Sequence, residues 1–230
     1  MKSVLLLSGG LDSAANLAFG CAESSGDISE SVLALTARYG QRSAEQEVYA
    51  SKALCEYYGV AHEIVDLGWL GGLGGSALTE AAQAVPEVGT DDLDRSAVTG
   101  PSAKAVWVPN RNGVLLNVAA AYAEARGAER VIVGFNSEEA ATFPDNSVEY
   151  MQRAEAALTL STATGVRVFS YTAAWDKTRI VKELLQLPRQ FPFELVWSCY
   201  QGTSGAMRTP CGKCESCRRF ERALRQGGVR

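Results

Sequence analysis

The sequence has a single histidine and no long apolar run, and both absences narrow the possible functions. Because His62 stands alone, we interpret it as a strand residue rather than a catalytic base. No apolar run approaches the roughly 20 residues that cross a bilayer, and the N-terminal run stops at Ser8, short of a signal-peptide core. We therefore expect a cytoplasmic protein that does not bind membranes. Thiols stay reduced in that compartment, so the six cysteines favour metal binding or core packing over disulfides.

The charge of the chain argues against a large nucleic-acid surface. Its 230 residues carry a net charge of −4, with 47% apolar and 21% charged side chains, which is typical of a globular domain with or without a small appendage. Basic residues gather at 199–230, where seven basic and two acidic side chains occur. Such a tail could contact RNA phosphates or offset the charge of a metal–thiolate site. The cysteines within it favour the second interpretation, and we expect no nucleic-acid partner.

One turn near the N-terminus carries the strongest functional signal. It reads Leu7-Ser8-Gly9-Gly10-Leu11-Asp12-Ser13 and lies between an apolar run and a segment with helical spacing. The glycines allow positive φ and close approach of a ligand, and a helix N-terminus offers free N–H groups to phosphate. The turn matches neither the P-loop nor the dinucleotide fingerprint. It resembles the Ser-Gly-Gly-x-Asp-Ser loop (PP-loop) of the ATP pyrophosphatases; the simpler alternative is a capped glycine turn.

Strand and helix patterns alternate along the chain. Apolar runs with strand character occupy residues 4–7, 32–37, 61–67, 106–108, 131–135 and 166–171. Helical periodicity follows at residues 11–22, 44–58, 111–127, 148–160 and 177–187. This alternation predicts an α/β fold with a doubly wound parallel sheet in residues 1–190. Periodicity fades at 68–104, where glycines cluster, so we expect a partly ordered flap over the site.

Polar loops follow four of the predicted strands. They occupy residues 8–13, 39–42, 109–112 and 136–139. In a parallel sheet of this kind, ligands bind at the carboxyl ends of the strands. The four loops therefore predict one binding site at that edge.

The cysteines near the C-terminus indicate a metal site in a small element at 191–230. The four candidate ligands are Cys199, Cys211, Cys214 and Cys217. Four thiolates form the usual closed shell of structural zinc. An iron–sulfur cluster is the alternative, because Cys-x-x-Cys-x-x-Cys also opens a ferredoxin pattern, but there the next cysteine follows rather than precedes. Cys21 and Cys55 fall on predicted helices and are expected to be core thiols.

Taken together, the motifs resemble the 7-cyano-7-deazaguanine synthase family, nearly from end to end. The matching segments are residues 8–13, 39–42, 75–79, 108–112, 134–136, 144–145, Lys177, and 197–200 with the three cysteines that follow. The resemblance implies that residues 7–13, Tyr39 and Gln41 bind ATP with Mg²⁺, that the cysteines hold zinc, and that the chain is a homodimer. It places Asp12, Arg111 and Lys177 at the reacting phosphate. The implied substrate-binding residues are Arg111, Asn112, Asn136, Phe143 and Asp145.

One segment departs from the family pattern. Glu139 stands in place of an aspartate, Ala140 in place of an aromatic residue, and Asn146-Ser147 in place of Cys-Arg. Phe143 offers another aromatic surface in the same segment. We expect this loop beside the deazaguanine, so the changes predict weaker binding of the same substrate.

The implied reaction is an ATP-dependent ligation. It would join 7-carboxy-7-deazaguanine and ammonia through an acyl adenylate and an amide to give 7-cyano-7-deazaguanine (preQ0). Ammonia would come from solution or from another protein, since the sequence gives no sign of a glutaminase. Three alternatives are an enzyme that uses another amine, a PP-loop enzyme that thiolates tRNA, and a non-catalytic zinc-stabilised binding module. The residues before 199 carry a net negative charge, which argues against the tRNA-thiolating enzyme. A binding module without catalysis leaves the polar loops unexplained.

Overall fold

Five parallel strands form one sheet in the order β3-β2-β1-β4-β5. The computed structural model describes residues 2–23, 31–202 and 209–229. The strands are β1 (Ser3–Leu6), β2 (Val32–Arg38), β3 (Ala61–Asp66), β4 (Arg130–Ile132) and β5 (Arg167–Phe169). Leu5 of β1 pairs with Ala34 on one side and with Ile132 on the other. This order confirms the doubly wound parallel sheet and places its switch point between β1 and β4, where such folds bind ligands.

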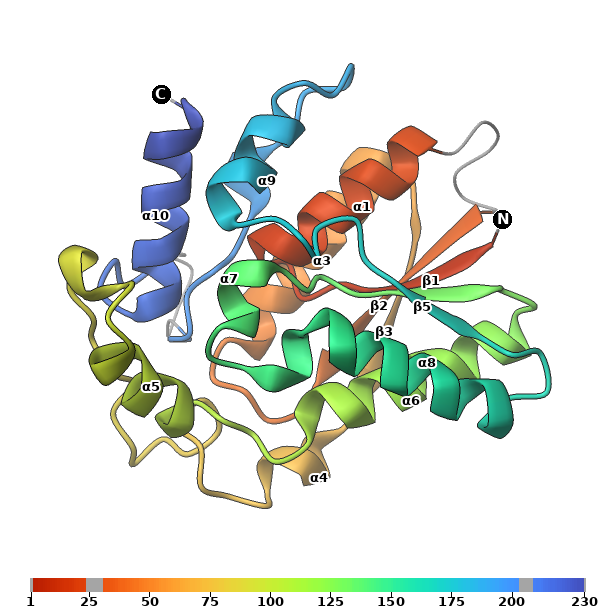
Figure 1. Cartoon of the computed structure of the whole chain (residues 1–230), viewed down its shortest axis with the longest axis horizontal. Coiled ribbons are helices and arrows are strands. Elements are labelled where there is room, and N and C mark those ends of the chain that lie inside the picture. Colours follow the sequence, from red (N-terminus) through yellow and green to blue (C-terminus); the bar gives the residue numbers. More distant parts are fainter. Residues whose placement is uncertain (1, 24–30, 203–208, 230) are drawn as a thin grey trace.

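Helices cover both faces of the sheet (Figure 1). One face carries α1 (Leu11–Glu23), α3 (Ala44–Tyr58), α9 (Lys177–Leu184) and α10 (Glu215–Gly227), which share a core with β1 and β2. The other face carries α6 (Arg111–Ala125) and α8 (Val148–Ser161) over a second core. No helix in the described part of the chain is both long enough and apolar enough to cross a membrane.

Short helices occupy the loops at the carboxyl edge. They are α4 (Gly68–Gly71), η1 (Thr90–Asp92), α5 (Ser96–Ala105), α7 (Ser137–Ala140), η2 (Pro144–Asn146) and η3 (Phe193–Leu195). The strand predicted at 106–108 is wrong, because Val106 ends α5 and Val108 packs with Tyr39 and Phe143 in a third apolar cluster. The two valines are buried beneath the flap, and they pair with no strand of the sheet. Their apolar pattern reflects this burial.

The flap at 68–104 is more structured than its sequence predicts, since it contains α5 with Pro101 inside the helix. It is also fastened to the C-terminal element. Glu87 forms an isolated β-bridge with Cys214, and the N–H of Val88 donates to the carbonyl of Lys213 at 3.1 Å. α10, which the sequence patterns did not predict, packs Ala223 into the first core.

The two cysteines outside the C-terminal cluster and the single histidine lie where expected. Cys55 is buried and Cys21 packs against the first core. Burial raises the pKa of each of these thiols to about 12, so both stay protonated and unreactive. His62 is a residue of β3, and its Nε2 lies 2.8 Å from the hydroxyl of Thr36.

Candidate active site

A cavity of about 250 Å³ opens at the carboxyl edge of the sheet, at the switch point between β1 and β4. Most of the predicted site residues line it: Leu7, Ser8, Gly10, Leu11, Asp12, Ser13, Tyr39, Arg111, Asn112, Phe143 and Lys177. Four of the residues predicted to bind ATP or substrate are absent from its described walls: Gly9, Gln41, Asn136 and Asp145. Each of these four touches or neighbours a residue that lines the cavity, so they form its support.

The turn after β1 has the backbone that a phosphate loop needs. Gly9 has φ +75°, and a Cβ there would lie 2.8 Å from that of Ala50, so only glycine fits. The hydroxyls of Ser8 and Ser13 lie 3.1 Å apart and tie the two ends of the turn together. Gly134 after β4 allows the loops to meet, because a Cβ there would lie 2.6 Å from the nitrogen of Ser13. Leu11, Asp12 and Ser13 at the start of α1 line the cavity, and the first N–H groups of a helix have no partner within it.

A buried ammonium lies between two carboxylates beside this turn. Lys177 Nζ is 2.5 Å from Asp12 Oδ2 and 3.1 Å from Glu139 Oε1. Burial opposes the charge on Lys177, but the two carboxylates outweigh it and raise its pKa above the usual value. Burial also raises the pKa of Asp12, more than Lys177 lowers it. Asp12, Glu139 and Lys177 follow β1, β4 and β5, so the loops after three strands bring these charged groups into contact.

The second oxygen of Asp12 bears on metal binding. Asp12 Oδ1 is buried and has no hydrogen-bond partner among the described residues. An unpaired buried carboxylate oxygen is costly in an apolar setting, but oxygen atoms of this kind are the ligands that Mg²⁺ uses. Asp12, with Glu139 near it, therefore fits a site for Mg²⁺.

Glu139 reaches the lysine because Asn136 shapes the loop that carries it. Asn136 caps α7, and its Oδ1 accepts the N–H of Glu139 at 2.9 Å. The side chain of Asn136 is fully buried, and its Nδ2 has no partner among the described residues. Asn136 thus lies behind the cavity wall. Sequence reasoning placed Glu139 in a polar loop but did not count it as a site residue.

Arg111 and Tyr39 form a second polar part of the cavity wall. The Arg111 guanidinium donates to the Tyr39 hydroxyl at 3.4 Å and to Asn112 Oδ1 at 3.3 Å. Asn112 Nδ2 donates to the backbone carbonyl of Asp145 at 3.4 Å. Burial disfavours the charge on Arg111, but Tyr39 and Asp145 raise its pKa above the usual value, so the cation persists. Burial raises the pKa of Asp145 although Arg111 opposes it.

A further carboxylate, Glu47, lines the cavity. Its two oxygens accept from the Ser43 hydroxyl at 2.6 Å and from Gln41 Nε2 at 2.9 Å. Gln41 Oε1 in turn accepts the N–H of Tyr39 at 2.8 Å. Gln41 therefore supports the loop after β2 from behind. Burial raises the pKa of Glu47, a residue for which the sequence gives no motif.

Aromatic side chains wall the cavity. Phe143 stacks on Trp107 with ring centroids 6.3 Å apart and an interplanar angle of 8°. Trp197 and Tyr200 come from the C-terminal part of the chain. The N–H of Trp197 donates to the carbonyl of Gly9 at 2.8 Å, so this wall is attached to the phosphate-type loop itself.

The four C-terminal cysteines meet in one cluster. The sulfurs of Cys199, Cys211, Cys214 and Cys217 all lie within 4.8 Å of one another, and those of Cys211 and Cys217 are 3.9 Å apart. A tetrahedral zinc with Zn–S bonds of about 2.3 Å needs sulfurs about 3.8 Å apart, so the spacing fits one ion. Thiol donors from Cys214 and Cys217 hold the pKa of Cys199 well below its usual range. A thiolate stabilised in this way is also the form that binds a metal cation.

Comparisons with known proteins show which family this chain is similar to. The family model of the queuosine biosynthesis protein QueC matches residues 2–228. A 7-cyano-7-deazaguanine synthase from Desulforudis audaxviator is 49% identical over 231 residues, covering 100% of both chains. Those from Desulforamulus reducens and Methanosarcina mazei are 47% and 46% identical, each covering 100% of this chain and 96% of the relative.

Among solved structures, the U34-tRNA thiolase NcsA from Methanococcus maripaludis with its [4Fe-4S] cluster gives a TM-score of 0.49 at 16% identity, covering 99% of this chain and 68% of that one. The family resemblance seen in the motifs is confirmed by the match along nearly the whole length. This chain therefore belongs to the queuosine biosynthesis protein QueC family, a family of enzymes.

Proposed function

We propose that this enzyme uses ATP to convert 7-carboxy-7-deazaguanine and ammonia into 7-cyano-7-deazaguanine. Its relatives are named as synthases of that nitrile. The observation in this chain that carries the proposal is the buried Lys177 ammonium, held between Asp12 and Glu139 at the start of α1. A phosphate bound there would meet both helix N–H donors and a fixed cation.

The proposed reaction has two activation steps. The substrate carboxylate attacks the α-phosphorus of ATP, pyrophosphate leaves, and an acyl adenylate forms. Ammonia displaces AMP to give the amide and a proton. The amide oxygen then attacks a second ATP, pyrophosphate leaves again, and loss of AMP and a proton gives the nitrile.

The contribution of the protein to this chemistry is positioning and charge stabilisation. The N–H groups of Leu11, Asp12 and Ser13 would bind the departing pyrophosphate. Lys177 would stabilise the charge that develops on the reacting phosphate, since its ammonium is fixed before the substrate arrives. Arg111 would hold the substrate carboxylate toward the α-phosphorus.

The deazaguanine ring would lie between Arg111 and the aromatic wall. Phe143 offers a ring face for stacking, already supported from behind by Trp107. Asn112 also lines the cavity and can bond a polar edge of the ring. Asn136 and Asp145, which stand behind the wall, would act on the substrate by holding the loops that touch it.

Two metals are part of the proposal. Mg²⁺, held by Asp12 with Glu139 nearby, would neutralise phosphate charge when bound. Zinc in the cysteine cluster would be structural, because four thiolates leave no open position. Sulfurs packed within 4.8 Å leave space for one ion rather than for several irons with their bridging sulfides.

The proposal is tested by product analysis. The purified enzyme is supplied with ATP, Mg²⁺, 7-carboxy-7-deazaguanine and ¹⁵N-ammonium, and AMP, amide and nitrile are followed by mass. The proposal predicts ¹⁵N in both amide and nitrile, with Asp12→Ala as the inactive control. If AMP forms only with another carboxylate, another amine or a tRNA, the substrate assignment fails. Sedimentation of the same sample tests the homodimer that the family resemblance implies.

A further inference from the structure

The carboxylate of Glu138 joins three elements directly behind the candidate active site. Its Oε2 accepts the backbone N–H of Lys177, the first residue of α9, at 3.2 Å. Its Oε1 accepts from Arg219 at 2.5 Å and from Arg222 at 2.7 Å, both on α10. Glu138 itself belongs to α7, next to Glu139. One carboxylate thus connects the loop after β4, the start of the lysine helix and the C-terminal helix.

Arg219 is the most constrained of these partners. Its guanidinium, with 6% of the side chain exposed, donates twice to Glu215 Oε1, at 2.9 and 2.8 Å. It also donates to the flap carbonyl of Leu93 at 2.9 Å, in addition to its bond to Glu138. A guanidinium with partners on three sides has a fixed plane. Arg219 therefore fixes the position of Glu138 from the direction opposite Lys177.

The charges around Lys177 show why this bond matters. Asp12 and Glu139 pair with the Lys177 ammonium. If Glu138 had no cationic partner of its own, it would compete with them for that ammonium. Arg219 and Arg222 supply that cation, since both lie within ion-pair distance of Glu138 Oε1. Burial opposes the charge on Glu138, but Arg219 and Lys177 together hold its pKa below its usual value. The Lys177 ammonium thereby stays directed at Asp12 and the cavity.

We propose that Arg219 and Glu138 are positioning residues for Lys177. They set the start of α9 by a bond to its first N–H, and they keep the ammonium beside Asp12 and Glu139. The cysteine cluster takes part through the chain, because α10 begins directly after Cys214. This inference rests on the proposed function in one respect: Lys177 acts on a reacting phosphate.

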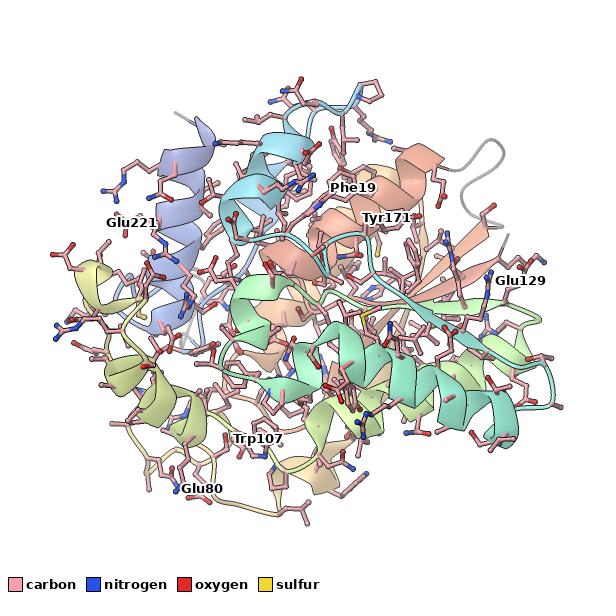
Figure 2. The ribbon with its side chains drawn as sticks, in the orientation of Figure 1. Phe19, Glu80, Trp107, Glu129, Tyr171 and Glu221 are labelled. Atoms are coloured by element: carbon pink, nitrogen blue, oxygen red, sulfur yellow. The ribbon has the colours of Figure 1, made fainter. Side chains whose placement is uncertain are left out.

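Glu138→Gln and Arg219→Met test the proposal against matched control variants on α10. Glu221→Gln is the same change as Glu138→Gln at an exposed carboxylate on the outer side of α10 (Figure 2). Arg225→Met is the same change as Arg219→Met at an exposed position. We expect kcat to fall about tenfold or more in the two test variants, with the KM for ATP changed less. The reason is that a displaced Lys177 ammonium would be misaligned with the reacting phosphate. The controls should keep wild-type kcat.

A second measurement needs no substrate. Limiting acetylation followed by peptide mass analysis gives the reactivity of Lys177 relative to Lys182, an exposed lysine on the same helix. Wild-type Lys177 should be protected, because it is buried and paired. Its relative reactivity should rise in the test variants, because an ammonium displaced from Asp12 and Glu139 loses this protection. The four melting temperatures are recorded alongside.

The outcomes separate this inference from the proposed function. Wild-type kcat and unchanged Lys177 reactivity in both test variants would overturn it. So would a lower melting temperature with wild-type kcat per folded molecule, since that describes a stabilising role alone. If the wild type makes no nitrile but Lys177 becomes reactive only in the test variants, the substrate assignment fails and the positioning role stands.

Discussion

Replacing Lys177 by Met should destabilise the protein and make its stability depend on pH near neutrality. The substitution keeps the length of the side chain but removes the ammonium. Asp12 and Glu139 are then left facing one another, with only 18% and 19% of their side chains exposed. Removal of one partner from a buried ion pair costs about 3 to 5 kcal/mol, because the other charge loses its compensation. Since both carboxylates keep some contact with water, we expect about 3 kcal/mol, the low end of that range.

The sign of the pH effect follows from the two pKa shifts. In the wild type the pKa of Lys177 is raised, so its contribution to stability is present below the ordinary lysine pKa and is lost only as the pH rises through the folded-state value. In the variant, Asp12 keeps the burial that raises its pKa and loses the lysine that lowers it. The folded state then binds more protons than the unfolded state. The variant should therefore gain stability as the pH falls from neutrality, by at most about 1.4 kcal/mol per pH unit for each proton taken up.

Urea unfolding followed by tryptophan fluorescence measures both effects without adding salt, which would screen the charges. The wild type, Lys177→Met and Asp12→Asn/Lys177→Met are compared at several pH values between 5.5 and 8, chosen as roughly the window in which a raised carboxyl pKa acts. The double variant should recover about 1 to 2 kcal/mol, because it removes one uncompensated carboxylate. The reasoning is refuted if Lys177→Met matches the wild type in stability, or if it becomes more stable as the pH rises.

Three further predictions concern the loop and the cysteines. Gly10→Ala should fold normally and lose pyrophosphate release, because a Cβ there meets nothing closer than 3.4 Å, whereas Gly9→Ala should lower the melting temperature; equal melting of the two variants would contradict this. Asp12→Ala should abolish pyrophosphate release with an intact circular dichroism spectrum; release at wild-type rates would exclude Asp12 from the site. Cys214→Ser should lower zinc content and stability together, on the order of several kcal/mol; iron without zinc in the wild type would refute the zinc assignment.

The sequence predicts the sheet well because its central strands β1, β2 and β4 are mostly buried and read as short apolar runs. The same rule fails at Val106 and Val108, because burial beneath a flap produces the same pattern as burial in a sheet. α5 escaped prediction because Gly100 and Pro101 fall in its middle, where both residues disfavour a helix. Local pattern thus identifies burial, and only tertiary contacts decide which element is buried.

The candidate site likewise has parts that the sequence predicts and parts that it does not. The turn around Gly9 could be predicted because its glycines and serines act within a few residues of one another. The bonds that Glu138 makes to α9 and α10 could not, because they join segments far apart in the sequence. Glu47 carries no motif at all, since its role depends on the neighbours that the fold brings to it.

The bond between Trp197 and Gly9 has a consequence for protein synthesis. All five strands are complete when β5 has been made, but the wall that includes Trp197 is translated later and Arg219 later still. A nascent chain therefore contains the residues of the sheet and of the glycine turn before it contains those that complete the cavity wall. The cavity described above therefore has all of its walls only after α10 has been synthesised and has docked.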